Sequence, residues 1–362
     1  MTGEPKITTP PIMMTLRRFS QGLDSIPTST AWCLADLGRA MGKQELFTRE
    51  SPQRLKALRE HALVESTVSS NRIEGVEVEP RRVATLVFGR PSLRDRNEEE
   101  VRGYRDALNL IHEKARNLPI SEETVRQLHR LTRGEIWDAG RYKEQDGEII
   151  EKSADGRQRV RFRPVPAAQT ASAMRELLSL WDSGLRDQRV HPLILLPVFN
   201  LDFLCVLPFR DGNGRVSRLL LLLQCYHLGY EVGRYISLER LIEQNKERYY
   251  ETLEQSSAGW HEDAHDPWPY VNYLLFILKT AYREFEERVG QTAEPRGAKT
   301  ELVGQAIQKA MGPFSVGDLQ RECPGVGLDL IRATLKRLRA EGRVECLGRG
   351  QHARWQKTPR RK

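Results

Sequence analysis

The sequence predicts a mainly α-helical protein that carries one β-hairpin and ends in a small, basic α/β module. Apolar residues recur at helical spacing over most of residues 30–290, and two short extended runs flank Asp155-Gly156. Residues 299–362 hold 14 Lys and Arg against 6 Asp and Glu, which equals the whole net charge of +8. A basic module on a neutral body suggests a polyanionic partner for that module alone.

The helices and strands are expected in the following order. Residues 1–30 form a lead-in for which we expect no regular structure, and a helix follows over residues 55–73, ending at Gly75. Further helices are predicted over residues 97–114 and 121–134, the second with Ser121 as its N-cap. Residues 149–151 and 159–163 form the hairpin, and helices resume over residues 167–182, 193–206, 215–228, 237–256 and 268–288.

We divide the chain into four segments by composition and pattern. They are an N-terminal helical region (residues 1–95), a central helical domain (96–290), a polar linker containing Pro and Gly (291–299) and the C-terminal module (300–362). A chain of 362 residues can bury a full core without covalent cross-links.

Composition excludes several classes of protein. The five cysteines are odd in number, widely spaced and without a C-x-x-C pair, which argues against disulfides and a cysteine zinc site. Residues 1–11 show no signal-peptide pattern, and the most apolar segment, 193–206, is too short and too interrupted to span a membrane. We therefore expect a cytoplasmic protein with no membrane contact.

A glycine-rich loop is the main candidate site. Residues 207–218 read LPFRDGNGRVSR and lie between two strongly apolar helical stretches. Glycines on both sides of Asn213, just before a helix, let backbone N–H groups approach an anion. Arg215 and Arg218 share a helical face and can bind phosphate oxygens, and Asp211 can hold Mg²⁺ through the phosphates. The alternative is an ordinary turn before a basic helix.

This loop resembles the Fic-family motif H-x-F-x-[DE]-G-N-G-R-x-x-R, which the sequence matches from Phe209 to Arg218 without a gap. The resemblance extends over roughly residues 50–290. It implies a Fic-type helical bundle with a hairpin flap that transfers AMP from ATP to a Ser, Thr or Tyr hydroxyl of a target protein. It assigns Mg²⁺ to Asp211, the inner phosphates to the loop, the outer phosphates to the two arginines, and the ATP site to Phe209, Gly212, Asn213, Gly214, Arg215 and Arg218.

The first position of the motif departs from the family. The resemblance assigns a histidine general base there, but this chain has Leu207, which has no proton acceptor. General base catalysis is worth roughly 10²–10⁴-fold in rate. Neither His191 nor Asp202 is an evident substitute. A nucleotide-binding pseudoenzyme, a weak enzyme and an enzyme with unusual chemistry therefore remain open.

An inhibitory element precedes the loop. Ser70, Glu74 and Gly75 match the family's inhibitory pattern [ST]-x-x-x-E-[GN]. The resemblance implies that Glu74 pairs with Arg218 and competes with the γ-phosphate of ATP. The alternative is that Glu74-Gly75 is only a helix C-terminus.

The resemblance also assigns the target and adenine contacts. The hairpin corresponds to the flap that pairs with an extended target segment, with Val160, Arg161 and Phe162 at the target-facing edge. By position, Tyr250 and Ser257 face the adenine base. Core packing is an equally good explanation of Tyr250.

Residues His261 to His265 also match the H-E-x-x-H pattern of zinc metalloproteases. Gly259 before the pattern and Asp266-Pro267 after it argue against a stable helix there. No third ligand is apparent downstream, so we reject a metalloprotease.

The C-terminal module shows three helical patterns, over residues 301–311, 315–321 and 328–341, followed by two short strands, 343–347 and 352–356. This order resembles a winged helix-turn-helix domain. Leu328, Ile331, Leu335 and Leu338 are expected to face its core. The resemblance implies that DNA is contacted by the third helix and the wing, through Arg332, Lys336, Arg337, Arg339, Arg349 and Arg354. A protein-binding winged helix is the alternative.

Two functions from different classes follow from these observations. The first is an ATP-dependent protein adenylyltransferase that uses Mg²⁺ and is held in check by Glu74. The second is a catalytically inactive, nucleotide-binding regulator that binds DNA. A homodimer is compatible with either function.

Overall fold

The computed structural model describes residues 14–48, 52–152, 158–290, 298–310, 312–323, 326–348 and 353–358. The chain divides into two compact units, residues 1–286 and 287–362. Helices dominate, and the strands form one two-stranded and one three-stranded sheet. The predicted fold class is confirmed.

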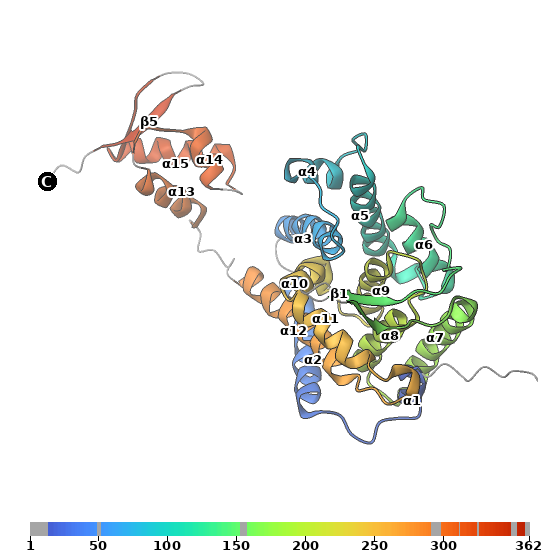
Figure 1. Ribbon diagram of the computed structural model, residues 1–362. Coiled ribbons are helices and arrows are strands. Elements are labelled where there is room, and N and C mark those ends of the chain that lie inside the picture. Colours follow the sequence, from blue (N-terminus) through green and yellow to red (C-terminus); the bar gives the residue numbers. More distant parts are fainter. Residues whose placement is uncertain are drawn as a thin grey trace, which may run out of the picture. The chain divides into compact units, whose positions relative to one another are not determined.

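The first unit is a bundle of helices around α8 (Pro192–Val206) and α9 (Asn213–His227) (Figure 1). Every residue of α8 from Leu193 to Val206 is buried, and α9 packs against α5, α6 and α8. The other helices are α1 (Thr15–Ser20), α2 (Thr28–Thr48), α3 (Pro52–Ile73), α4 (Pro80–Phe88), α5 (Arg96–Lys114), α6 (Glu122–Arg133), α7 (Ala167–Asp187), α10 (Leu238–Gln244), α11 (Lys246–Ser257) and α12 (Trp268–Gly290), with short 3₁₀ turns η1 (Ala115–Asn117), η2 (Val232–Arg234) and η3 (Trp260–Glu262).

Local capping fixes several helix ends. The Asp95 carboxylate accepts from the Glu98 N–H at 2.9 Å at the start of α5. The Ser121 hydroxyl accepts from the Thr124 N–H at 3.2 Å at the start of α6. Each cap satisfies an N–H group that has no partner within its helix. At Gly103, where α5 crosses α6, an added Cβ would collide with the Leu131 carbonyl oxygen, so only glycine allows this close approach.

The prediction of an unstructured lead-in is wrong for residues 14–20. These residues include α1, whose Leu16 and Phe19 side chains are buried. The buried Asp202 carboxylate on α8 accepts from the Thr15 and Leu16 N–H groups at 3.0 and 2.8 Å. A six-residue helix is too short to show a helical period, so its sequence gives no signal of this tertiary contact.

The single helix expected over residues 237–256 is broken. Asn245 has φ −119° and separates α10 from α11. Its side-chain amide donates to the Leu241 carbonyl at 2.9 Å, so the side chain satisfies a carbonyl at the end of α10. Because of this break, α10 and α11 are two separate helices that meet at Asn245.

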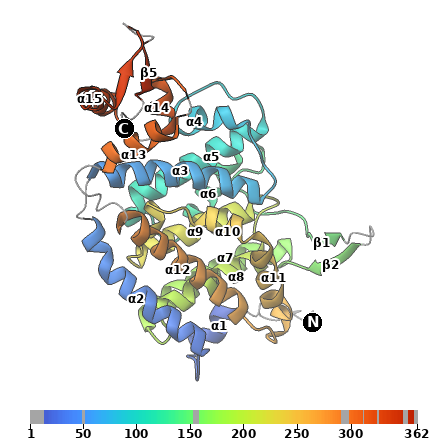
Figure 2. The ribbon, with the colours of Figure 1, turned by 90° about the vertical axis from the view of Figure 1, so that its left-hand side faces the viewer.

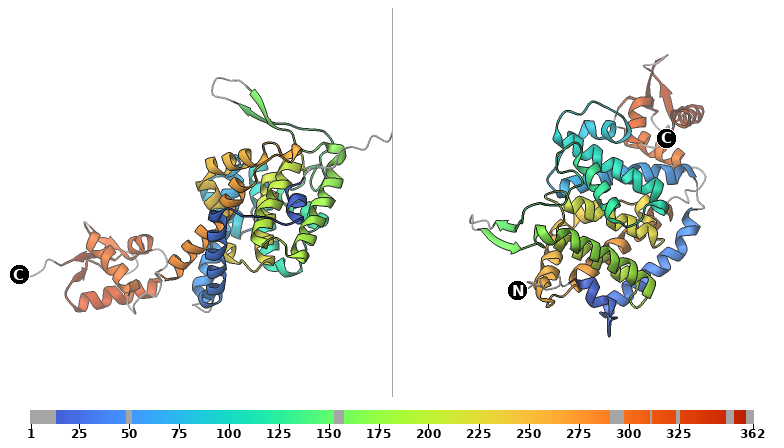
Figure 3. Two further views of the ribbon diagram at one scale, coloured as in Figure 1. Left: turned by 90° about the horizontal axis from the view of Figure 1, so that it is seen from below. Right: turned by 90° about the vertical axis from the view of Figure 1, so that its right-hand side faces the viewer.

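The predicted hairpin is present as antiparallel strands β1 (Ile149–Lys152) and β2 (Gln158–Phe162). It stands out from the helical body (Figures 2 and 3). A register shift occurs between Ile149 and Ile150. The expected Asp155-Gly156 turn lies outside the described residues.

The second unit contains α13 (Ala298–Lys309), β3 (Phe314–Ser315), α14 (Val316–Glu322), α15 (Leu328–Ala340), β4 (Val344–Cys346) and β5 (Arg354–Lys357). Its sheet has the order β3-β5-β4. The two-residue strand β3 was not predicted, and Ala298 and Lys299 of the predicted linker belong to α13; the linker's other residues, 291–297, lie outside the described ranges.

The core of the second unit includes Ile331, Leu335 and Leu338 on α15, as expected from the helical spacing. Leu328, also predicted to face the core, is 37% exposed. It is the first residue of α15, where the helix is only beginning to turn toward the core. Within the described parts of the chain, no helix is both long and apolar enough to cross a bilayer.

Candidate functional site

The candidate site is built on the turn that joins α8 to α9. Leu207 ends α8 with φ +47°, and Gly212 precedes α9 with φ +79°. The Asn213 carboxamide closes the turn, because its Oδ1 accepts from the Phe209 N–H at 2.9 Å and its Nδ2 donates to the Phe209 carbonyl at 2.8 Å. The first N–H groups of α9 have no carbonyl one turn before them, so this end of the helix favours an anion.

His129 on α6 packs against the turn and stabilises it. Its ring stacks on Phe209 with centroids 3.7 Å apart. Its Nδ1 accepts from the Gly140 N–H at 2.8 Å, so Nε2 carries the proton and donates to the Asp211 carbonyl at 3.0 Å. Burial lowers the pKa of His129 to about 4, which keeps the ring neutral at neutral pH. Phe209 is fully buried, so it supports the loop from within the core.

The two arginines on α9 have different surroundings. The buried Arg215 guanidinium donates to Glu100 Oε2 at 2.5 Å and to Asn71 Oδ1 at 3.5 Å. The expectation that Arg215 is aimed at phosphate oxygens is therefore not met in this conformation, because its Nη1 is committed to Glu100. Sequence spacing does not identify this partner, which lies on α5.

Arg218 instead faces the end of α3. Its Nε donates to Ser70 Oγ at 2.8 Å, and its Nη2 donates to the Ser70 carbonyl at 2.9 Å and to Glu74 Oε1 at 2.8 Å. Its Nη1 is buried and has no hydrogen-bond partner among the residues that the structure describes. A buried guanidinium with a spare donor is suited to binding an anion.

Glu74 occupies the start of α9. Gly75 ends the preceding segment with φ +78°, and a Cβ added at Gly214 would collide with Glu74 Oε1. The carboxylate therefore lies directly over the first turn of α9 and against Arg218, where the helix end and the guanidinium both favour negative charge. Its side chain is 30% exposed, so it can leave this position toward solvent.

Asp211 lies at the mouth of the loop with its side chain 60% exposed. Arg133 donates to its Oδ2 at 2.6 Å, and the Gly212 N–H donates to its Oδ1 at 2.6 Å. Partial burial alone would raise the pKa of Asp211, but the Arg133 charge and the Gly212 N–H hold it below its ordinary value. An ionised, exposed carboxylate fits Mg²⁺ when phosphates supply further oxygens. In the described part of the chain, no group of three His, Cys, Asp or Glu side chains forms a complete protein metal site.

Residues 119–225, which include α6, the hairpin and the whole loop, match the family model described as Fic/DOC family. The protein contains a Fic domain. Solved structures of Fic proteins share its fold: one from Desulfovibrio desulfuricans G20 has a TM-score of 0.60 at 21% identity, covering 93% of this chain and 98% of that chain. A Fic domain containing signaling protein from Bacteroides thetaiotaomicron VPI-5482 has a TM-score of 0.58 at 21% identity (71% and 97% covered). Fic-1 from C. elegans has a TM-score of 0.56 at 18% identity (72% and 74% covered).

Leu207 stands where the Fic motif begins, and its side chain lines a cavity of about 480 Å³. The residues considered as substitute bases have structural roles. His191 Nδ1 accepts from the Leu193 N–H at 3.1 Å and caps α8, while Asp202 is tied to α1 and to the Trp260 indole. Burial raises the pKa of Asp202 to about 6, but its oxygens are already occupied by these donors.

The H-E-x-x-H residues, His261 to His265, do not share one helical face. His261 lies in the 3₁₀ turn η3 and contacts the Arg163 carbonyl at 2.7 Å through Nε2. His265 lies beyond that turn and contacts Thr15 Oγ1 at 2.8 Å through Nε2. Both rings are thus engaged with the protein at different places.

The hairpin and the end of α11 line a second cavity of the first unit, of about 440 Å³. Val160, Arg161 and Ser257 lie in its wall. Phe162, which was predicted to face the target, is buried against Trp260 and His261 and anchors the hairpin instead. The Tyr250 hydroxyl lies 3.5 Å from the Ile73 carbonyl, close to the end of α3.

The second unit displays a basic helix. The predicted DNA-contacting side chains Arg332, Lys336, Arg337 and Arg339 on α15 are exposed, as is Arg354 on β5. Arg332 and Arg337 also make long surface pairs with Asp329 and Glu341, at 3.9 and 3.7 Å. Arg349 lies outside the described residues.

Proposed function

We propose that the Fic domain transfers AMP from ATP to a hydroxyl group of a target protein, and that Glu74 restrains this activity. The position of the Glu74 carboxylate carries the proposal. It lies over Gly214 and against Arg218, at the one end of α9 where the helix and a buried guanidinium both favour an anion. A phosphate group would take the same place only after Glu74 has moved.

The reaction requires the target hydroxyl to attack the α-phosphorus and pyrophosphate to leave. In the proposal, the N–H groups at the start of α9 and the spare Nη1 of Arg218 bind phosphate oxygens and stabilise the charge that develops on them. Asp211 would hold Mg²⁺, which supplies further positive charge to the phosphates when bound. His129 and Asn213 keep the loop in position.

The hairpin supports a protein rather than a small molecule as the acceptor. Its strands form a two-stranded sheet that projects from the body, and Ile150 and Val160 are exposed on it. An exposed strand can pair with an extended target segment through main-chain hydrogen bonds. Such pairing would bring a side-chain hydroxyl toward the loop that follows α8.

The identity of the transferred group provides a direct test. We expect the Glu74→Gly protein to become labelled, or to label a target, with ATP carrying label on the α-phosphate but not on the γ-phosphate. Adding Arg218→Ala should lower α-labelling at least about tenfold, because a charge-assisted hydrogen bond contributes roughly 1.5–3 kcal/mol. Label arriving from the γ-phosphate, or equal labelling without Arg218, would contradict AMP transfer at this site.

A second function is favoured by the exposed basic side chains of α15. We propose that the second unit binds DNA, with phosphate contacts from this helix. In the full chain, Arg332→Ala with Lys336→Ala should weaken DNA binding and reduce the slope of log affinity against log salt by about two. Arg283→Ala, which removes an exposed charge from α12, is the control. An unchanged salt slope in the double variant would place the DNA site elsewhere.

Leu207 supplies no proton acceptor at the motif position, which favours a related alternative. In this alternative the Fic domain binds nucleotide without transferring AMP, and the nucleotide regulates DNA binding. In that case no variant retaining Leu207 would incorporate AMP. ATP would bind and change the affinity of the full chain for DNA. AMP incorporation by the Glu74→Gly protein, without any change at Leu207, would contradict this alternative.

A further inference from the structure

Lys143 donates hydrogen bonds to the backbone carbonyls of both residues next to Leu207. Its N–H donates to the Pro208 carbonyl at 2.9 Å, and its Nζ donates to the Val206 carbonyl at 3.0 Å. The side chain is buried, with 9% of the residue exposed. The amine is therefore held by the residue that precedes Leu207, and Leu207 stands where the Fic motif has its histidine.

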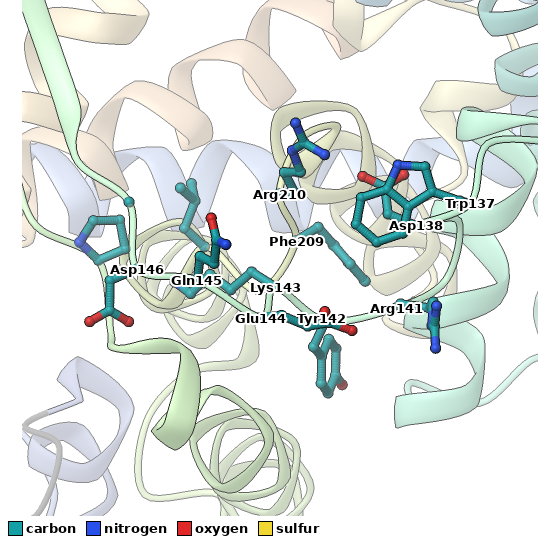
Figure 4. Close-up of a pocket in the computed structure, with 13 residues that line it drawn as sticks. Trp137, Asp138, Arg141, Tyr142, Lys143, Glu144, Gln145, Asp146, Phe209 and Arg210 are labelled. Carbon is teal, nitrogen blue, oxygen red and sulfur yellow. The ribbon is translucent and has the colours of Figure 1, made fainter.

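The same lysine lines the cavity that Leu207 lines. The segment from Arg141 to Asp146 forms one side of this cavity, and Phe209 and Arg210 lie on the other (Figure 4). The cavity has a volume of about 480 Å³, enough for a side chain of a bound protein segment. An acceptor hydroxyl entering it would meet both the loop that precedes α9 and the Lys143 amine.

The surroundings raise the fraction of Lys143 that is a neutral amine. Burial lowers the pKa of Lys143 to about 8, and the Asp146 carboxylate opposes this shift only partly. A share of the amine is then uncharged at neutral pH and has a free lone pair. A neutral amine still has two N–H bonds, so it can donate to Val206 and accept a proton at the same time.

We propose that Lys143 is the general base for AMP transfer and performs the role that Leu207 cannot. This inference rests on the proposed function. The neutral amine takes the proton of the acceptor hydroxyl while the oxygen attacks the α-phosphorus. The bond from that phosphorus to its bridging oxygen breaks, pyrophosphate leaves with the electron pair, and the ammonium returns its proton to water.

The test uses the full chain in the Glu74→Gly background, with α-labelled ATP. Lys143→Met should lower the labelling rate roughly 100-fold or more, in the range of general base catalysis. Lys143→Arg should lower the labelling rate to the same extent, because arginine keeps the hydrogen-bond donors but cannot lose its proton. Lys114→Met, which removes an exposed lysine at the end of α5, should leave the rate unchanged.

Restoring the family's histidine separates loss of the base from loss of the fold. Adding Leu207→His to Lys143→Met should restore labelling, because an imidazole then stands at the motif position. The pH dependence should change as well. With Lys143 the rate rises as pH rises through about 8, whereas with a histidine it should rise near the ordinary imidazole pKa of about 6.5.

Five other charged side chains line this cavity. They are Asp138, Arg141, Glu144, Asp146 and Arg210, and Asp146 is the one that raises the pKa of Lys143. Asp146→Asn should therefore lower the midpoint of the rate, while loss of Lys143 removes that midpoint altogether.

Each outcome separates this inference from the proposed function. If Lys143→Met labels as fast as its Glu74→Gly parent, Lys143 is not the base but AMP transfer stands. If only variants with Leu207→His are labelled, Lys143 is not the base, and the chain with Leu207 senses nucleotide without transferring AMP. If no variant is labelled although ATP binds, AMP transfer and the role of Lys143 are both rejected.

Discussion

Replacing Glu74 by glycine is expected to raise AMP incorporation by about 10- to 100-fold over the unmodified chain. The carboxylate pairs with Arg218 and lies over Gly214, so its removal would leave both free to bind phosphate, as the proposed function requires. A hydrogen bond to a charged group contributes roughly 1.5–3 kcal/mol, which sets the size of the effect. Labelling rates and ATP affinity, measured side by side, check it.

Two further variants show whether charge or bulk is responsible. Glu74→Gln keeps the side-chain shape and should activate partly, because the amide no longer repels phosphate but still reaches Arg218. Glu77→Gly makes the same charge change at an exposed position nearby and should have no effect. If Glu74→Gly leaves both rate and affinity unchanged, Glu74 is only the end of a helix.

The parts of the site that the sequence could predict are those that are adjacent along the chain. The turn from Phe209 to Gly214 and the helix behind it are recognisable because the glycines and Asn213 are needed for backbone geometry. The pairing of Glu74 with Arg218 was expected only through the resemblance to Fic proteins. Helical spacing alone could not identify a partner 144 residues away.

The supporting residues were missed because tertiary packing alone brings them to the loop. His129 and Arg133 come from α6, and Lys143 comes from an irregular segment. A single histidine or lysine on a polar segment carries no signal of what it will contact. Arg215 shows the same limit. The sequence predicts that it shares a helical face with Arg218, but it does not identify Glu100 as its partner.

Helices and strands with a strong local sequence pattern were predicted correctly. Features without such a pattern were missed. The predicted N-cap Ser121 does begin α6. The break at Asn245 and the two-residue strand β3 depend on a single side chain and on sheet pairing, respectively. Neither produces a period long enough to recognise.

Replacing Glu100 by alanine is expected to destabilise the first unit by about 3–5 kcal/mol, because it leaves buried charges without their partner. The Glu100 carboxylate accepts from three arginines: from Arg215 at 2.5 Å, from Arg133 at 3.1 Å and from Arg96 at 3.0 Å. Without it, the guanidiniums of Arg215 and Arg133 would face each other inside the bundle. Arg133 would keep Asp211 as a partner, whereas among the residues that the structure describes Arg215 would keep only the Asn71 amide oxygen.

Calorimetry of the full chain measures this effect, since it follows the unfolding transition of the first unit directly. Glu100→Ala should lower the midpoint by roughly 10 °C for a unit of this size. Glu99→Ala, on the same helix but 43% exposed and paired with Arg96, should change the stability by less than about 0.5 kcal/mol. Equal stability of the two variants would mean that solvent, rather than Glu100, compensates the buried arginines. The Glu100 carboxylate would then have no part in fixing the loop through Arg133.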